Sequence, residues 1–295
     1  RFFGQGMLGH ISMVFCGKWF FKNKGKAVAV ANSGYTLAEA IMPTIFVALI
    51  GVLSWQVSWY VSIIMSILIL ASVRFLAKTE RDKGSKPQKE NQQVGMLKKS
   101  WKRSEMLRSW VFWAAVPGLM TSPMITTTLF FHQVHLVEIK SWDLSTYVLF
   151  IPAYSAATLF SLYLIGYLVD KLSTKLILPV FLFPLISGLL LLSIATSYFE
   201  LLLIFILLGL SAGAYIVVYG TFFPEFFGSL YLGSVRTVGV TIMVFSSAIG
   251  PVLSGYFIDL GYLIDHQFKF FAAFSVFASL LFLTINLSVK LPENA

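Results

Sequence analysis

The stretch AVAVANSGYTLAEAIMPTIFVALIGVLSWQVSWYVSIIMSILILASV, residues 27–73, contains a single charged side chain, Glu39. An apolar helix of about 20 residues is long enough to cross the hydrocarbon core of a bilayer. The stretch is too long for one such helix, so it predicts two membrane spans. The turn between them is expected at residues 51–56.

The same pattern continues along the whole chain. Of 295 residues, 57% are hydrophobic and only 12% are charged, whereas a soluble domain needs about 25% charged residues to cover its surface. No segment predicts a soluble domain. The uncharged runs predict an all-α membrane protein with nine spans, at residues 2–17, 27–50, 55–73, 109–133, 145–168, 176–196, 201–222, 237–258 and 270–289.

The positive charges indicate the topology. If the spans alternate, 19 of the 22 Lys and Arg residues lie in connections on one side of the membrane. Cytoplasmic connections carry the excess of Lys and Arg. We therefore expect the cytoplasmic side to contain the C-terminus and residues 18–26, 74–108, 170–175 and 223–236. On this interpretation, the net charge of +9 reflects the orientation of the chain in the membrane. We expect the protein to contact the lipid bilayer and to bind no nucleic acid.

The longest polar stretch divides the spans into three and six. We predict that residues 1–76 belong to an N-terminal helical bundle, that 77–108 form a cytoplasmic linker, and that 109–295 form a six-helix bundle. Residues 96–107 predict either a helix on the membrane surface or a solvated loop. Gly25 precedes Pro43 by the same interval as Gly233 precedes Pro251, which suggests an internal repeat, a common feature of transporters.

One loop motif points to a family. GYLVDKLSTKL begins at Gly166 and resembles the loop signature of the major facilitator superfamily, a Gly, Leu, Asp and basic residue in fixed order. Gly166, Asp170 and Lys171 match it, whereas Ser173 replaces a glycine. RFFGQG at residues 1–6 resembles the Arg- and Gly-rich motif of the fourth helix. PEFFGSLYLGSVR, residues 224–236, resembles the acidic-to-basic loop before the eleventh helix.

The resemblance implies a two-bundle transporter whose halves rock about a site near the bilayer midplane. It also implies that the chain runs from the fourth helix to the twelfth, so three helices of the first bundle are expected to precede it. Within the superfamily, residues 19–34 and 130–138 are similar to the monocarboxylate and oxalate:formate branch. We expect a monomer in the plasma or inner membrane.

Two polar groups in the first spans are candidates for substrate binding. A charge inside a span normally faces a cavity, so Arg1, with Gln5 one turn further, is expected to grip a carboxylate. The alternative is an arginine at the membrane interface. Asn32, Thr36 and Glu39 form a second polar stripe at helical spacing. Glu39 is either a proton-coupling group or a structural hydrogen-bond partner.

Hydroxyl and imidazole side chains supply further candidates. Tyr154, Thr158 and Tyr215 lie on hydroxyl stripes that suit either a cavity wall or helix packing. His132 and His135 are candidate proton-linked groups or interfacial histidines. Pro117, Gly118 and Pro123 predict a bend or break in that span.

The resemblance gives a gating role to residues at the cytoplasmic rim. Asp170, with Gly166 and Lys171, is expected to cap a helix N-terminus or pair with a cation in one conformation only. Glu225 and Arg236 are expected to act in an equivalent way.

No motif for a catalytic, nucleotide or metal site is present, so we expect neither an enzyme nor a cofactor. The sequence predicts secondary transport of a small organic anion, a mono- or dicarboxylate, by proton symport or anion exchange. Efflux of amphipathic compounds is an alternative. A membrane sensor or scaffold without flux is another.

Arg1 yields the first testable prediction. In the full-length protein, Arg1→Lys should weaken anion binding partly because it keeps the charge but loses the fork geometry. Arg1→Gln should weaken it much more, while a neutral analogue loses little. Affinities for anionic and neutral compounds measure this. Unchanged anion affinity in Arg1→Gln would exclude Arg1 as the anion site.

Overall fold

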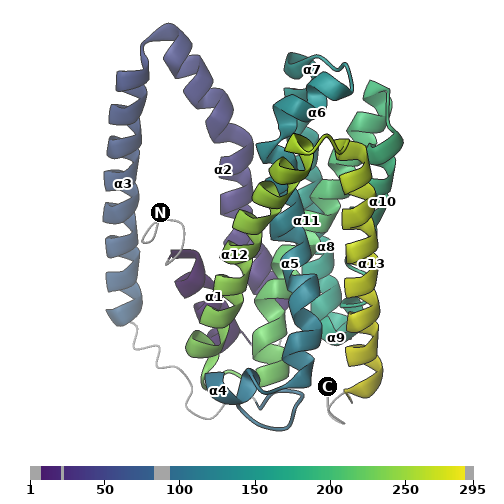
Figure 1. Cartoon of the computed structure of the whole chain (residues 1–295). Coiled ribbons are helices and arrows are strands. Elements are labelled where there is room, and N and C mark those ends of the chain that lie inside the picture. Colours follow the sequence, from purple (N-terminus) through teal and green to yellow (C-terminus); the bar gives the residue numbers. More distant parts are fainter. Residues whose placement is uncertain (1–7, 21–22, 83–93, 290–295) are drawn as a thin grey trace. The chain divides into compact units, whose positions relative to one another are not determined.

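The structure is a computed structural model that describes residues 8–20, 23–82 and 94–289. It comprises two compact units. Unit 1 contains the described residues of Arg1–Thr36 and Gln93–Ala295, and unit 2 those of Leu37–Gln92. Unit 2 consists of two helical segments joined by a turn at residues 53–54 (Figure 1).

The described residues form helices and contain no strand. The helices are α1 (Leu8–Trp19), α2 (Lys24–Val52), α3 (Trp55–Asp82), α4 (Arg103–Met106), α5 (Trp110–Phe131), α6 (Gln133–Ile139), α7 (Leu144–Val148), α8 (Ile151–Leu172), α9 (Thr174–Ile177), α10 (Phe183–Ile194), α11 (Tyr198–Phe227), α12 (Leu232–Asp259) and α13 (Ile264–Ser288). Among them, six segments are long and apolar enough to cross a membrane: Trp55–Arg74, Trp110–Phe131, Thr146–Leu172, Tyr198–Phe227, Leu232–Asp259 and Ile264–Ser288.

Two predicted spans differ from the observed helices at prolines. The predicted span 176–196 is divided into α9 and α10 by a turn at residues 178–182. Pro179 lies in this turn and Pro184 begins α10, where a missing N–H is tolerated. The break expected near Pro117 and Pro123 does not occur, because α5 continues through both prolines.

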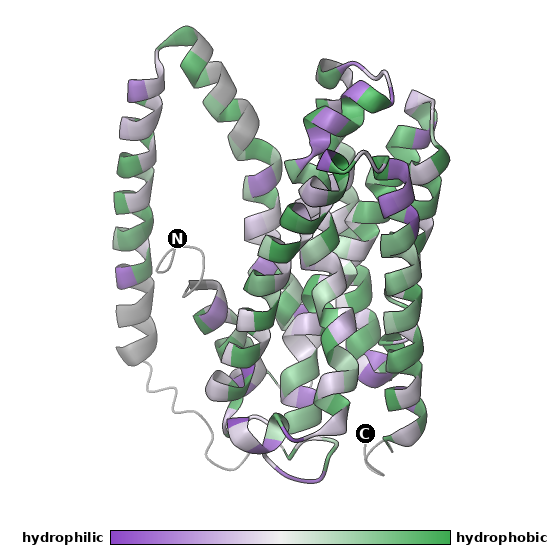
Figure 2. Cartoon of the chain, viewed as in Figure 1, coloured by the Kyte–Doolittle hydropathy of each residue, from purple (hydrophilic) through white to green (hydrophobic). Residues whose placement is uncertain are grey.

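The surface of unit 1 is suited to lipid. Figure 2 shows apolar residues along the length of the long helices and hydrophilic residues gathered toward their ends. Large apolar side chains are exposed on several helices, for example Phe131 at 71%, Ile194 at 67% and Phe245 at 65%. Such exposure would be costly in water and is expected in a bilayer.

Glycines bring the central helix α11 close to α8. A Cβ added at Gly213 would collide with the carbonyl oxygen of Thr158 and lie 2.7 Å from the Ser161 Cβ. A Cβ at Gly209 would collide with the carbonyl of Tyr154. Close backbone approach through small residues is the usual way in which membrane helices associate. The same helix also packs against α10, and α5 packs against α12 and α13.

The connections gather at two opposite ends of unit 1. The connections predicted to be cytoplasmic meet at one end, where residues 24–26, 95–101, 170–174 and 225–227 are in contact. At the other end, Lys140 forms an ion pair of 2.9 Å with Asp265, and the Trp142 indole donates to the Thr196 carbonyl. This grouping agrees with alternating spans.

Of the two sequence interpretations of residues 96–107, the structure agrees with a loop over most of the segment, although the loop packs against the end of α11 and is only partly solvated. The backbone N–H groups of Met96, Leu97 and Trp101 donate to the carbonyls of Glu225, Phe226 and Phe227. Helix α4 adds one turn only. The loop satisfies carbonyls that the end of α11 leaves without helical partners.

The tight α8–α11 contact yields a stability prediction. Gly213→Ala should destabilise the protein by about 1–3 kcal/mol, the usual range for overpacking. Gly233→Ala is the matched control, because no atom lies within 4 Å of a Cβ at Gly233. Thermal unfolding in detergent measures both. Equal midpoints for the two variants would show that the backbones are not in close contact.

Candidate functional site

The N-terminus of α2 is held by a carboxylate from α8. Asp170 Oδ1 accepts a hydrogen bond of 2.7 Å from the Gly25 N–H, and Oδ2 accepts one of 3.0 Å from the Lys26 N–H. These N–H groups lie in the first turn of α2 and have no partner within the helix. A negative charge at a helix N-terminus is favoured by the helix dipole as well as by the hydrogen bonds.

Two glycines allow this contact. A Cβ at Gly25 would collide with the Gly166 carbonyl, and a Cβ at Gly166 would lie 2.8 Å from the Gly25 carbonyl oxygen. The first turn of α2 therefore lies directly against the backbone of α8. Any larger side chain at either position would move the N–H groups away from Asp170.

An ion pair accompanies the cap. Lys24 Nζ lies 3.1 Å from Glu225 Oε2, with 15% and 5% of the two side chains exposed. Glu225 also accepts from the backbone N–H and the hydroxyl of Thr174. Buried charges need such partners, and removal of one member of a buried pair typically costs about 3–5 kcal/mol.

Two further lysines surround one aromatic ring at the same end. Lys26 Nζ lies 5.7 Å and Lys171 Nζ 4.6 Å from the centroid of Tyr167, within the range of cation–π interactions. We call the set Lys24, Gly25, Lys26, Gly166, Asp170, Thr174 and Glu225 the latch. It ties the start of α2 to α8 and α11 by a helix cap and an ion pair.

A protein-family comparison adds to this geometry. The model described as Major Facilitator Superfamily matches residues 2–251. The chain belongs to the Major Facilitator Superfamily. No curated protein matches it. The molecule is therefore an all-α, multi-pass integral membrane protein of a superfamily of secondary transporters.

Most gating candidates of this superfamily member meet in the latch. Gly166, Asp170 and Glu225 belong to it, and Lys171 adjoins it. Arg236 does not pair with Glu225; it is buried beside Tyr219, with its Cζ 5.2 Å from the ring centroid. The gating roles themselves stay predictions.

The candidate substrate-binding residues do not belong to the latch. Arg1 and Gln5 lie outside the described residues. On α2, Asn32 donates to the Val28 carbonyl and Thr36 to the Asn32 carbonyl, both within the helix. Glu39 lies further along the same helix, in unit 2, with an exposed side chain.

The hydroxyl candidates take part in helix packing. The Tyr215 hydroxyl donates to the Leu119 carbonyl of α5 at 2.9 Å, and Thr158 donates to the Tyr154 carbonyl at 2.8 Å. The Tyr154 ring packs edge-to-face with Phe130. The Tyr215 and Tyr154 contacts reach α5 and favour the packing interpretation, whereas the Thr158 bond lies within α8 and favours neither interpretation.

The histidines lie at the other end from the latch. His132 caps α5, and its Nε2 lies 3.0 Å from the Pro251 carbonyl oxygen of α12. His135 is half-buried on α6. Neither belongs to a metal site, because the described residues contain no group of three His, Cys, Asp or Glu that could hold an ion.

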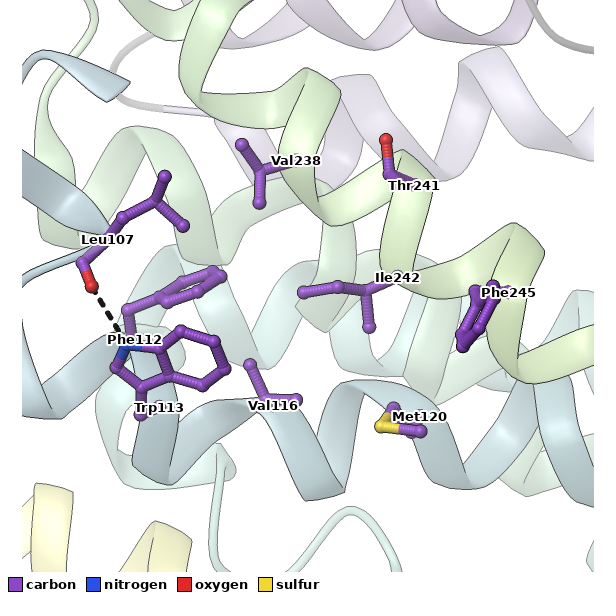
Figure 3. Close-up of a pocket in the computed structure, with 9 residues that line it drawn as sticks. All are labelled: Leu107, Phe112, Trp113, Val116, Met120, Val238, Thr241, Ile242 and Phe245. Carbon is purple, nitrogen blue, oxygen red and sulfur yellow. Dashed lines mark hydrogen bonds between the residues drawn. The ribbon is translucent and has the colours of Figure 1, made fainter. Parts of the chain in front are cut away.

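An apolar groove lies between α5 and α12, which otherwise pack against each other. Figure 3 shows Trp113, Val116 and Met120 of α5 facing Val238, Ile242 and Phe245 of α12. The groove has a volume of about 210 Å³, and Thr241 contributes its only side-chain hydroxyl. The Trp113 indole is already bonded to the Leu107 carbonyl. No charged residue lines this groove, so it suits an apolar group and not an anion.

Sequence reasoning missed Lys24, Gly25, Lys26 and Thr174 as latch residues. The available signal was the predicted topology, which placed residues 18–26, 170–175 and 223–236 on one side. Acidic and basic residues on the same side of the membrane are candidates to form ion pairs, but the sequence does not give the distances between them.

The latch geometry predicts that the negative charge of Asp170 favours contact between α2 and α8. With Cys16 replaced by Ser, cysteines at Lys26 and Lys171 should be cross-linked rapidly by a short reagent, because both side chains lie at the Tyr167 ring. Asp170→Asn should slow this several-fold, since it removes the charge that caps α2. Asp259→Asn, at the exposed end of α12, is the control. Equal cross-linking rates in all three proteins would exclude Asp170 as the closing group.

Proposed function

We propose that the protein is a secondary active transporter of a small organic anion, a mono- or dicarboxylate, and works by alternating access through proton symport or anion exchange. The latch is the observation that carries the mechanism. It joins the first turn of α2 to α8 and α11 through a helix cap and a buried ion pair. Such contacts define one discrete state of a two-state equilibrium.

The substrate class rests on the sequence. Arg1 begins a span within a motif that resembles the fourth helix of the family, and a guanidinium binds a carboxylate bidentately. Glu39 remains the candidate for proton coupling, with His132 and His135 as further candidates. The His132 Nε2 atom lies 3.0 Å from the Pro251 carbonyl oxygen. Because a carbonyl oxygen only accepts hydrogen bonds, Nε2 carries a proton in this contact.

Efflux of amphipathic compounds is the second candidate function. The apolar groove between α5 and α12 favours it, because an uncharged, partly aromatic lining suits such compounds. A sensor or scaffold without flux is the third candidate, and differs by binding a solute without moving it.

Transport by reconstituted protein separates these candidates. The full-length protein in proteoliposomes should accumulate a labelled carboxylate when a pH gradient or an internal carboxylate is supplied. Asp170→Asn should slow the uptake about tenfold or more and leave equilibrium affinity nearly unchanged, because the latch biases the conformations without touching the solute. Asp259→Asn is again the control.

The outcomes differ between the three functions. Movement of neutral amphipathic dyes without carboxylate uptake would replace the anion carrier by the efflux transporter. Saturable carboxylate binding with no flux under any gradient would indicate the sensor. Wild-type uptake that Asp170→Asn leaves at full rate would remove the latch from the mechanism.

A further inference from the structure

Arg236 is a buried cation to which the described residues offer no counter-charge. It is the fifth residue of α12 and is 3% exposed. Its Nε and Nη1 atoms have no hydrogen-bond partner. The described residues form three ion pairs, and none of them includes Arg236.

Burial of an unpaired guanidinium costs free energy and destabilises the folded protein. Buried charges are normally paired, and an isolated one loses its hydration without compensation. Arg keeps its proton at any working pH, so it cannot escape the cost by becoming neutral. An unpaired buried group of this kind calls for an explanation, and a bound anion is the simplest one.

Three helices surround the guanidinium. The ring of Tyr219 on α11 lies 5.2 Å from the Arg236 Cζ, and the buried Tyr219 hydroxyl, like Nε and Nη1 of Arg236, has no hydrogen-bond partner among the described residues. Gly239 on α12 leaves room chiefly for the Phe223 ring of α11, with which an added Cβ would collide, and the Tyr219 hydroxyl lies beside it, 3.1 Å from that position.

Helix α1 forms the third wall. Gly17 packs on α12, where an added Cβ would lie 2.6 Å from the Leu232 Cδ2. The same helix carries the side chains of His10 and Cys16. Neither supplies a carboxylate, so the third wall leaves the charge unbalanced.

We infer that Arg236 binds the carboxylate group of the transported anion. The inference rests on the proposed function and assigns a binding group to it. Nε and Nη1 are neighbouring donors that match the two oxygens of one carboxylate. The Tyr219 hydroxyl is a further donor beside them, and its ring holds the guanidinium plane from one side.

The position of Arg236 connects binding to conformational change. Both free donors are enclosed in this structure, so an anion reaches them only when α1 moves away from α11 and α12. Closure over an empty site leaves the guanidinium unpaired, whereas closure over a carboxylate does not. A bound anion therefore favours the enclosed arrangement.

The test compares stability and binding in purified full-length protein. The probes are unbranched mono- and dicarboxylates from acetate to succinate, with their neutral amides as controls. Carboxylates should raise the thermal midpoint of the wild type and the amides should not. Arg236→Met replaces the arginine by an uncharged side chain of similar length. It should raise the thermal midpoint of the protein without carboxylate, and added carboxylates should no longer raise that midpoint.

Two further variants sharpen the result. Arg236→Lys keeps the charge and loses the paired donors, so its carboxylate affinity should fall about tenfold or more, the equivalent of one charge-assisted hydrogen bond. Arg108→Met removes an exposed arginine from the latch end of unit 1 and should behave as wild type. A residue with only a structural role would not give higher stability together with lost binding.

The contrary results are distinct. Retained carboxylate stabilisation in Arg236→Met would overturn the inference, and so would a lower midpoint of the empty Arg236→Met protein. If wild type takes up carboxylates while Arg236→Met keeps its affinity, the inference fails and the transport proposal stands. If wild type neither binds nor transports any carboxylate, both fail.

Discussion

The cap that Asp170 places on the first turn of α2 is the interaction on which the described site depends. It fixes α2 against α8 at a distance that only glycine backbones permit, at Gly25 and Gly166. That register brings Lys24 to Glu225, which also holds Thr174. The set therefore combines close glycine packing with a helix cap and a buried ion pair.

The helices of unit 1 are held together by a different chemistry. Gly209 and Gly213 let α11 lie against α8, and hydroxyls such as Tyr215 donate to carbonyls of neighbouring helices. These contacts are enclosed and satisfied, which suits a rigid body. Arg236 differs from these contacts, because it is a buried charge between α1, α11 and α12 that forms no ion pair with the described residues. Close helix packing, polar contacts at one end and a buried cation are the features on which we base the proposed closure over an anion.

Much of this fold was predictable from the sequence, because lipid imposes long apolar helices that hydropathy reveals directly. The all-α class was confirmed, and six described segments match predicted spans. The division at Pro179 was missed because composition alone does not show where a helix tolerates proline. Asp170 was expected from its motif either to cap a helix N-terminus or to pair with a cation. Its partner on α2, the Lys24–Glu225 pair and the isolation of Arg236 depend on distances between helices, which no local pattern encodes.

The central claim is that the latch opens and closes as one unit. Spin labels at Asn23, beside the start of α2, and at Ser234 on α12 report this directly, since both positions are exposed. Their distance distribution in proteoliposomes would be measured by electron double resonance for wild type and Asp170→Asn. The account predicts a short and a long population in wild type, with Asp170→Asn shifted toward the long one. A single distance, identical in both proteins, would contradict it.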